Sequence, residues 1–403
     1  MKIGISGCGA FAECFIPLYK EHPLVDKVVL ADIITDRARD AAKRYGINQV
    51  VESHDALCQS DVDAIAIYTQ RHLHGMQAVQ AMQSGKHVYS AVPAAGSMEE
   101  IEELVQTVEQ TGMQYMSGET SYYYPAAIYC RDKFATGELG EFVYGEGEYM
   151  HDMAHGFYEA FQHSGGDDWK RVAGIPPMHY PTHSTSMIIS TVGQTLTHVS
   201  CYGYRDRHSD EIYGEGRNNW DNPFSNQSAL FRTSGGGICR VNEFRRIGHG
   251  IGNCVRTSIY GTLGCYEEQG NAQLWTNHAR EQEDLADMLH CGNEAGHFDP
   301  DLASGQQLDF YSSYAKNHPV HRLPKSFANL PNGHFGSHQF LVDDFVRSVQ
   351  QNKLAPNHVW ASARYLIPGL VAHQSSLKGG EQLPIPDLGS PPEDASLISY
   401  DPY

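Results

Sequence analysis

The chain has 403 residues, which at ~150 residues per domain allows two or three domains and a large buried core. Its composition is that of a globular protein, with 41% hydrophobic and 19% charged residues. The net charge of −19 disfavours nucleic acids and anionic membranes as partners, and no apolar run approaches the ~20 residues that span a bilayer.

The start of the chain and its cysteines predict a cytoplasmic location. A strand pattern begins at once, over residues 2–7, so we expect no signal peptide. The nine cysteines form no CxxC pair, and Cys8, Cys130 and Cys254 fall inside apolar segments. This usage favours reduced thiols over a disulfide framework.

A glycine-rich turn follows the first strand. Residues 7–12 read GCGAFA, a GxGxxA pattern that opens a predicted amphipathic helix over residues 10–21. In a dinucleotide-binding turn, Gly7 allows the sharp bend, Gly9 lets the backbone approach a pyrophosphate, and Ala12 permits close packing of helix on strand. The N–H groups at the start of the helix are then available to phosphate oxygens.

The second strand supplies a carboxylate at the expected spacing. It covers residues 27–32 and ends in Asp32, 20 residues after Ala12, where a ribose-binding carboxylate is expected. A carboxylate repels a 2′-phosphate, so the sequence favours NAD over NADP. Arg37 and Arg39 are near enough along the chain to leave NADP open.

Strands and helices alternate through the first third of the chain. We expect further strands at residues 63–69, 87–92 and 113–118, and helices at 72–85 and 97–112. This alternation predicts a doubly wound parallel sheet of the Rossmann type, with its ligand at the carboxyl ends of the strands. Those ends carry Gly7 to Ala12, Asp32, Thr69 to His74, Ala91 to Pro93, and Glu119.

The pattern changes after residue 125. A helix at 125–137 leads to an alternating strand at 138–152, and five more two-periodic segments predict an open, largely antiparallel sheet. These segments are 197–204, 228–234, 237–246, 256–264 and 272–277. Residues 278–333 are expected to be irregular, and two helices, at 337–351 and 358–379, close the chain. We therefore predict a Rossmann domain at 1–122 and a substrate-binding and oligomerisation α/β domain at 123–403.

Together these segments resemble the Gfo/Idh/MocA family of NAD(P)-dependent oxidoreductases, most of which act on sugars. The landmarks, which cover nearly the whole chain, are GCGAFA (7–12), YTQRHLH (68–74), GKHVYSAVPAA (85–95), GELGEFVY (137–144), YGTLG (260–264) and GLVAHQSSLKGGEQLPIP (369–386). The resemblance implies a Rossmann domain and a larger α/β domain whose open sheet faces the nicotinamide. It also implies a homodimer or homotetramer formed through that sheet.

One departure from the family affects the chemistry. The common E-K-P triplet is Ala91-Val92-Pro93 here, and valine cannot exchange a proton with a substrate hydroxyl as the family's lysine does. The VPAA form is similar to the NAD-dependent α-N-acetylgalactosaminidases and related NAD-dependent glycosidases. Three further motifs match that subgroup, namely GET at 118–120, YMH at 149–151 and YPTH at 180–183.

The subgroup implies hydrolysis without net redox. The sugar's C3 is oxidised, a base removes the acidified C2 proton, the C1 substituent is eliminated, water adds, and the hydride returns. We expect His183 to deprotonate the C3 hydroxyl, and Tyr180 or Tyr149 to act at C2. Glu119 is expected to orient the substrate or contact the nicotinamide ribose, and His151 to hold substrate hydroxyls. Each of these residues also has an ordinary structural alternative, as a sheet residue or a helix cap.

The expected ligands are NAD and a small carbohydrate, with no metal. The residues expected to bind the cofactor are Gly7, Gly9, Ala10, Phe11, Ala12, Asp32, Thr69, His72, His74, Val92, Pro93 and Glu119. His334 and His338 have an i, i+4 spacing that can bind zinc, but no third ligand is evident.

A charged segment precedes the YPTH motif. Asp167, Asp168, Lys170 and Arg171 are predicted to lie on a loop. A basic residue there would suit an anionic or acylated sugar, and the alternative is a solvated charge cluster without function.

Two other functions stay open at this point. One is a plain NAD-dependent sugar or polyol dehydrogenase in which His183 replaces the family's lysine. The other is a cofactor-binding sensor or assembly partner without turnover. The missing lysine disfavours the dehydrogenase, and the presence of Glu119, Tyr180 and His183 disfavours the sensor.

Overall fold

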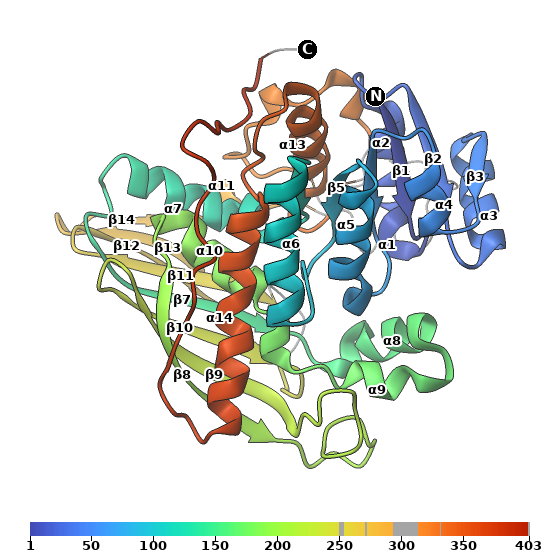
Figure 1. Cartoon of the computed structure of the whole chain (residues 1–403). Helices are drawn as coiled ribbons and strands as arrows, with labels where there is room; N and C mark the ends of the chain where they lie inside the picture. Colours follow the sequence, from blue (N-terminus) through green and yellow to red (C-terminus); the bar gives the residue numbers. More distant parts are fainter. Residues whose placement is uncertain (250–253, 271, 293–312, 331, 402–403) are drawn as a thin grey trace. The chain divides into compact units, whose positions relative to one another are not determined.

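The computed structural model describes residues 1–249, 254–270, 272–292, 313–330 and 332–401 (Figure 1). The chain forms two compact units. The first unit comprises Met1–Pro125, Met288–Ala363 and Leu388–Tyr403, and the second comprises Ala126–Asp287 and Arg364–Asp387. Each unit therefore contains segments that are distant in the sequence. The domain boundary predicted after residue 122 stays a prediction.

The first unit is built on a six-stranded parallel sheet in the order β3-β2-β1-β4-β5-β6, which confirms the predicted Rossmann architecture. Ile3, Ile5, Leu30 and Ile65 are fully buried, as expected for parallel strands covered on both faces. The strands are β1 (Lys2–Ser6), β2 (Lys27–Ala31), β3 (Gln49–Val51), β4 (Ala64–Ile67), β5 (His87–Ser90) and β6 (Tyr115–Ser117).

The helices of the first unit bring one correction. The single helix predicted over residues 10–21 is wrong, because α1 ends at Glu13 and α2 begins at Ile16. Pro17 lies in the first turn of α2, where its missing N–H is tolerated, but it would break a continuous helix. The others are α3 (Thr35–Tyr45), α4 (His54–Gln59), η1 (Arg71–Leu73), α5 (His74–Gln83), α6 (Met98–Thr111), η2 (Thr120–Tyr123), η6 (Val320–Arg322), η7 (Lys325–Phe327) and α13 (His338–Gln351).

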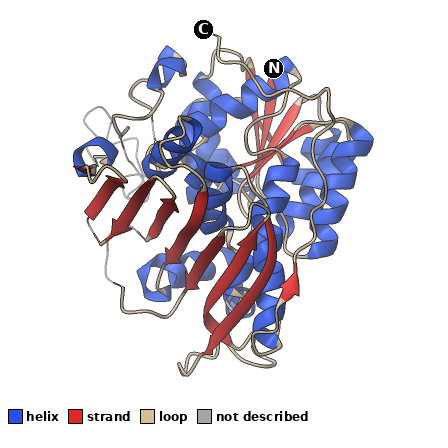
Figure 2. Cartoon of the chain, turned by 90° about the vertical axis from the view of Figure 1, so that its left-hand side faces the viewer, coloured by secondary structure: helices blue, strands red, loops and turns tan. Residues whose placement is uncertain are grey.

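The second unit contains a nine-stranded sheet in the order β14-β13-β12-β11-β7-β10-β9-β8-β15, which Figure 2 shows as one curved layer. Only the β7–β10 pair is parallel among its described neighbours, so the predicted largely antiparallel sheet is confirmed. The strands are β7 (Phe142–Met150), β8 (Leu196–Arg205), β9 (Phe224–Thr233), β10 (Ile238–Phe244), β11 (Val255–Gly261), β12 (Gly264–Gln269), β13 (Ala272–Asn277), β14 (Gln282–Asp284) and β15 (Leu383–Pro384).

The helices of the second unit lie mainly between β7 and β8 in the chain. They are α7 (Pro125–Ala135), η3 (Met153–Phe157), α8 (Tyr158–Gly165), η4 (Gly166–Asp168), α9 (Trp169–Ala173), η5 (Pro177–His179), α10 (Thr182–Val192) and most of α14 (Val359–Leu377). The loop predicted for residues 167–171 is therefore wrong, since it forms η4 and the start of α9.

The segment predicted as irregular, residues 278–333, is only partly so. Its described residues include β14, which pairs with β13 at the sheet edge, and α11 (Ala286–Leu289). Residues 293–312 and 331 lie outside the described part of the chain. Among the described helices, none combines the length and apolar character needed to cross a membrane.

Candidate functional site

The glycine-rich turn of the first unit has the geometry that a dinucleotide requires. Gly7 has a φ of +90°, and a Cβ there would lie 2.8 Å from the carbonyl oxygen of Tyr68, so only glycine fits. Gly9 is the N-cap of α1, makes no side-chain capping bond, and has open space around the position of a Cβ. The N–H groups at the start of α1 are thus uncapped by a side chain, which fits a pyrophosphate.

Asp32 stabilises the same turn. Its side chain is 6% exposed, its Oδ2 accepts a hydrogen bond from the Cys8 N–H at 2.9 Å, and its Oδ1 accepts one from the Ile34 N–H at 2.8 Å. A carboxylate oxygen has a second lone pair, so these bonds leave capacity for ribose hydroxyls. The Arg37 guanidinium lies 3.7 Å from Oδ2.

His74 connects two of the predicted cofactor-binding loops, those that contain Thr69 and Pro93. Its Nδ1 is 2.9 Å from the Pro93 carbonyl oxygen, and its Nε2 is 3.2 Å from the Thr69 carbonyl oxygen. Burial lowers the pKa of His74 to about 4, so the neutral ring donates to only one of these acceptors at a time. Both ring nitrogens therefore face the main chain, and direct contact of His74 with the cofactor stays a prediction.

The other predicted residues of the first unit lie at the same strand ends. Val92 is 8% exposed and precedes a cis peptide bond to Pro93, whereas His72 is exposed in η1. Glu119 is fully buried after β6, where its Oε1 accepts a hydrogen bond from the Ser121 N–H at 2.9 Å and caps η2. This bond fixes the orientation of the carboxylate, and the contact of Glu119 with the substrate or the nicotinamide ribose stays a prediction.

The predicted catalytic residues of the second unit form one cluster. The ring of His183 lies 5.4 Å from that of Tyr149 and 5.3 Å from that of Tyr180, and both pairs meet edge to face. The two tyrosine rings are 6.1 Å apart. Tyr149 is the last residue but one of β7, while Tyr180 and His183 flank the start of α10, so the sheet and the covering helix bring the three together.

His151 extends this cluster and its protonation state follows from its partners. Its Nε2 is 2.6 Å from the His155 carbonyl oxygen, which can only accept, so Nε2 carries the hydrogen. In the neutral ring Nδ1 then carries no hydrogen, so it accepts a hydrogen bond from the Tyr149 hydroxyl. The two atoms are 3.0 Å apart. The ring of His151 stacks on Phe157 at 4.1 Å. Tyr149 therefore has a neighbouring proton acceptor with a fixed orientation.

Two charged residues of the cluster were missed at the sequence level. Glu243 and Arg245 lie on β10 and just after it, are 0% and 5% exposed, and form an ion pair of 2.8 Å. The available signal was the alternation of β10, which places Glu243 on the same buried face as Cys239 and Val241. A charged residue on a buried strand face marks a polar network.

The charged segment before the YPTH motif is exposed. Lys170 lies 4.0 Å from the Glu211 carboxylate, and the Arg171 Nε donates to the Asn219 side-chain oxygen at 3.0 Å. These contacts are those of surface side chains, and a substrate contact there stays a prediction.

His334 and His338 form a hydrogen-bonded pair in the first unit. The His334 Nδ1 and the His338 Nε2 are 2.8 Å apart, and His338 packs on Phe15 with ring centroids 4.3 Å apart. Burial holds the pKa of His338 well below its usual range, so its ring is neutral. Within the described residues, no group of three His, Cys, Asp or Glu side chains is placed to hold a metal.

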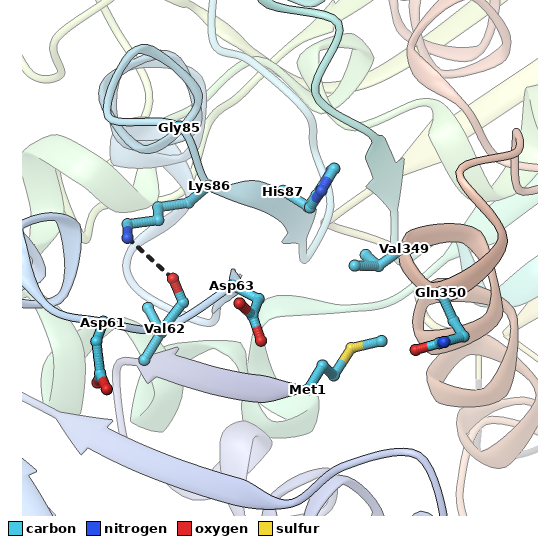
Figure 3. Close-up of a pocket in the computed structure, with 9 residues that line it drawn as sticks. All are labelled: Met1, Asp61, Val62, Asp63, Gly85, Lys86, His87, Val349 and Gln350. Atoms are coloured by element: carbon cyan, nitrogen blue, oxygen red, sulfur yellow. Dashed lines mark hydrogen bonds between the residues drawn. The ribbon is translucent and has the colours of Figure 1, made fainter.

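A cavity of about 580 Å³ lies at the amino-terminal ends of the strands of the Rossmann sheet, whereas the glycine-rich turn lies at their carboxyl ends (Figure 3). The Lys86 ammonium donates to the main-chain oxygens of Ser60 and Val62 at 2.8 and 2.9 Å. The cavity is lined by Met1, Asp61, Val62, Asp63, Gly85, Lys86, His87, Val349 and Gln350, and no predicted site residue is among them. The cavity and the glycine-rich turn therefore lie at opposite ends of the parallel strands.

The parallel sheet, the glycine turn and Asp32 define the first unit as a dinucleotide-binding domain of oxidoreductase type. Residues 1–119 match the model of the Gfo/Idh/MocA oxidoreductase family with an NAD-binding Rossmann fold, so this part of the chain is similar to the NAD-binding domain of that family. This confirms the resemblance and the NAD cofactor predicted from the motifs.

Known proteins of two kinds are similar to the chain. It is 25% identical to a glycosyl hydrolase family 109 protein of Streptomyces filamentosus, over 96% of this chain and 77% of that protein. It is 36% identical to an α-N-acetylgalactosaminidase of Bacteroides fragilis, over 32% of this chain and 31% of that protein. A levoglucosan dehydrogenase in complex with NADH and levoglucosan shares the fold, with a TM-score of 0.70 and 16% identity, over 96% of this chain and 99% of that chain.

Proposed function

We propose that the chain hydrolyses a glycoside and uses NAD as a hydride acceptor that is regenerated in each turnover. The steps are oxidation at C3, elimination of the C1 substituent, addition of water and reduction of the ketone. The observation that carries the proposal is the cluster of Tyr149, Tyr180 and His183 in a chain whose residue 92 is valine. Elimination requires a second proton-transfer group, at C2, which a simple dehydrogenation does not. The glycosyl hydrolase relatives support this choice of chemistry.

The cofactor half of the proposal belongs to the first unit. Bound NAD supplies a reversible hydride acceptor. The uncapped turn at residues 7–12 would hold the pyrophosphate and Asp32 the adenosine ribose, as their geometry allows. Because the reaction returns the hydride, NAD is regenerated in each turnover and does not have to dissociate.

His183 is proposed to remove the proton of the C3 hydroxyl. Its imidazole is 5% exposed at the start of α10, between two tyrosine rings. An imidazole nitrogen can accept a proton, which a valine at residue 92 cannot do. Hydride loss from C3 becomes favourable as the oxygen loses its proton, so His183 governs the first step.

Tyr149 is proposed as the base at C2, in preference to Tyr180. Its hydroxyl donates to the His151 Nδ1 at 3.0 Å, so the phenol proton has a place to go before the C2 proton is taken. The resulting tyrosinate oxygen accepts the C2 proton, and the C–H electron pair then expels the C1 substituent. Tyr180 and Glu119 are proposed to orient the sugar.

The decisive experiment uses a nitrophenyl glycoside deuterated at C2 and the purified holoenzyme. We expect aglycone release, loss of the deuterium to solvent water, and no accumulation of NADH. Release of the aglycone with the deuterium retained would refute elimination and indicate direct displacement. Loss of the label with steady accumulation of NADH would indicate instead a dehydrogenase whose 3-keto product enolises.

The assembly and location of the enzyme are further parts of this proposal. We propose a homodimer or homotetramer formed through the second unit's sheet, because Tyr202, Tyr204, Leu230 and Ile238 on that sheet are 68%, 51%, 52% and 44% exposed. Sedimentation should show an oligomer that Leu230→Lys dissociates. A cytoplasmic location is supported by the nine free cysteines, and fractionation of the source cells tests it.

A further inference from the structure

A guanidinium group lies against the ring of the proposed C2 base. The Arg245 guanidinium carbon is 4.5 Å from the centroid of the Tyr149 ring. Its Nη1 donates to the main-chain oxygens of Tyr149 and Phe244, both at 3.1 Å, and its Nη2 donates to the Glu243 Oε2 at 2.8 Å. Three hydrogen bonds thus fix a permanent positive charge beside this tyrosine.

Glu243 connects that guanidinium to α10, the helix that carries His183. It is the direct cross-strand neighbour of Tyr149 in the β7–β10 pair, and it is 0% exposed. Its Oε1 accepts a hydrogen bond from the Ser184 hydroxyl at 2.6 Å, and Ser184 follows His183 in α10. One carboxylate therefore ties the cation beside the proposed C2 base to the helix of the proposed C3 base.

We propose that Arg245 is a positioning residue that stabilises the tyrosinate form of Tyr149, and that Glu243, held by Ser184, sets how strongly it does so. This inference rests on the proposed function, in which Tyr149 removes the C2 proton.

The proton balance of the step explains why a cation is needed. The Tyr149 hydroxyl first gives its proton to the His151 Nδ1, which leaves a tyrosinate and an imidazolium whose Nε2–H still donates to the His155 carbonyl. The ordinary pKa values of Tyr and His are about 10 and 6.5, so this transfer is unfavourable by about 3.5 pKa units in water. An opposite charge within about 4–6 Å lowers the pKa of such a group by about 1–3 units.

Glu243 makes this stabilisation depend on pH. Burial raises the pKa of Glu243 to about 7, although Arg245, Ser184 and His183 oppose the shift. Where Glu243 is protonated, the charge of Arg245 acts on Tyr149 alone, and where it is ionised, it cancels part of that charge. The titratable groups around the pair are Tyr149, His183, Tyr213 and Cys254.

The test compares two variants that should act in opposite directions. In the holoenzyme, the rate of C2 deuterium loss is followed against pH, alongside the single-turnover rate of hydride transfer. Arg245→Met should move the acid limb of C2 exchange up by about 1–3 pH units, which is about 10- to 1,000-fold slower at a fixed pH on that limb. Glu243→Gln should move the limb down, and Arg245→Met should change hydride transfer by less than about fivefold.

Two further variants separate electrostatics from packing. Arg245→Lys keeps the charge, so its acid limb should lie at least halfway back from that of Arg245→Met to that of the wild type. Arg364→Met removes an arginine paired with Asp387 and should leave the pH profile of C2 exchange unchanged. Slower exchange in both Arg245→Met and Glu243→Gln with no movement of the acid limb would overturn the proposal, because that is the signature of structural damage alone.

A second measurement does not depend on turnover or on a foldable Arg245 variant. Ultraviolet difference titration of the wild type against Tyr149→Phe should show one tyrosinate forming below the range of ordinary tyrosines. Its midpoint should move lower in Glu243→Gln. If the wild type does not exchange C2 deuterium, the proposed function fails, while the titration still decides the inference: an ordinary midpoint for Tyr149 would overturn it.

Discussion

A methyl group on Gly147 would come within 2.3 Å of the carbonyl oxygen of Ser184. The backbone of α10 therefore lies directly on β7, at a point where no side chain intervenes. Tyr149 is two residues further along β7 and His183 immediately precedes Ser184, so this close approach sets the distance between the two proposed bases.

We expect Gly147→Ala to push α10 away from β7. Overpacking against backbone destabilises a protein by about 1–3 kcal/mol or more. Both the melting temperature and the rate of C2 deuterium loss should fall. Gly248→Ala is the control, because a Cβ at Gly248 meets nothing within 4 Å. Equal melting temperatures for the two variants would contradict this account of the helix position.

Asp32→Ala should weaken NAD binding and reduce the preference for NAD over NADP. The variant removes the proposed ribose acceptor and also the bonds to the N–H groups of Cys8 and Ile34, so the turn loosens as well. Asp32→Asn keeps one oxygen acceptor without the charge and should separate the two effects. Calorimetry with both nucleotides is the measurement, and unchanged affinity in Asp32→Ala would rule out the assignment.

Val92→Lys tests whether the chain is a dehydrogenase that has lost its proton donor. If the enzyme is a hydrolase, the new lysine brings no gain, and because Val92 is only 8% exposed, the longer side chain should hinder substrate binding. Steady-state NADH production from free sugars is the readout. A clear increase would count against the proposed hydrolysis.

His183→Ala should abolish hydride transfer, since no other group of the cluster is proposed to take the C3 hydroxyl proton. The single-turnover NADH signal should disappear while NAD affinity stays unchanged. Tyr149→Phe is the matched comparison, because it should retain the transient NADH signal and lose C2 exchange. A transient of normal amplitude in His183→Ala would refute its role.

The free energy of unfolding should fall as the pH drops from about 6.5 towards 4, in part because of His318. Its Nδ1 accepts a hydrogen bond from the Ala315 N–H at 2.9 Å and its Nε2 faces the Tyr123 carbonyl oxygen at 2.8 Å. Burial lowers the pKa of His318 to about 4, so in this window the unfolded chain binds more protons than the folded one. The loss is up to about 1.4 kcal/mol per pH unit for this group.

His318→Gln should therefore be less stable at pH 7 but show a shallower fall of the melting temperature between pH 6.5 and 5. His321→Gln, at an exposed position nearby in the chain, should keep the slope of the wild type. A steeper slope in His318→Gln would show that the neutral, buried ring is not what titrates.

The sequence by itself determined the features that depend on short stretches of chain. The alternation of strands and helices, the φ requirement at Gly7 and the spacing from Ala12 to Asp32 are local, and the first unit has the sheet they predict. The break at Pro17 was also local, but a hydrophobic pattern that continued past it masked the interruption. The helices at 153–173 are short and partly polar, and their periodicity was too weak to distinguish them from a loop.

Only the tertiary structure decided what surrounds the proposed bases. The sequence motifs indicated Tyr149, Tyr180 and His183 as candidate catalytic residues. The parallel pairing of β7 with β10 places Glu243 beside Tyr149. Arg245 reaches the Tyr149 main chain across 96 residues of sequence. Strand register follows from the packing of whole faces and from the approach of α10 to β7, and no local pattern encodes a contact of that range.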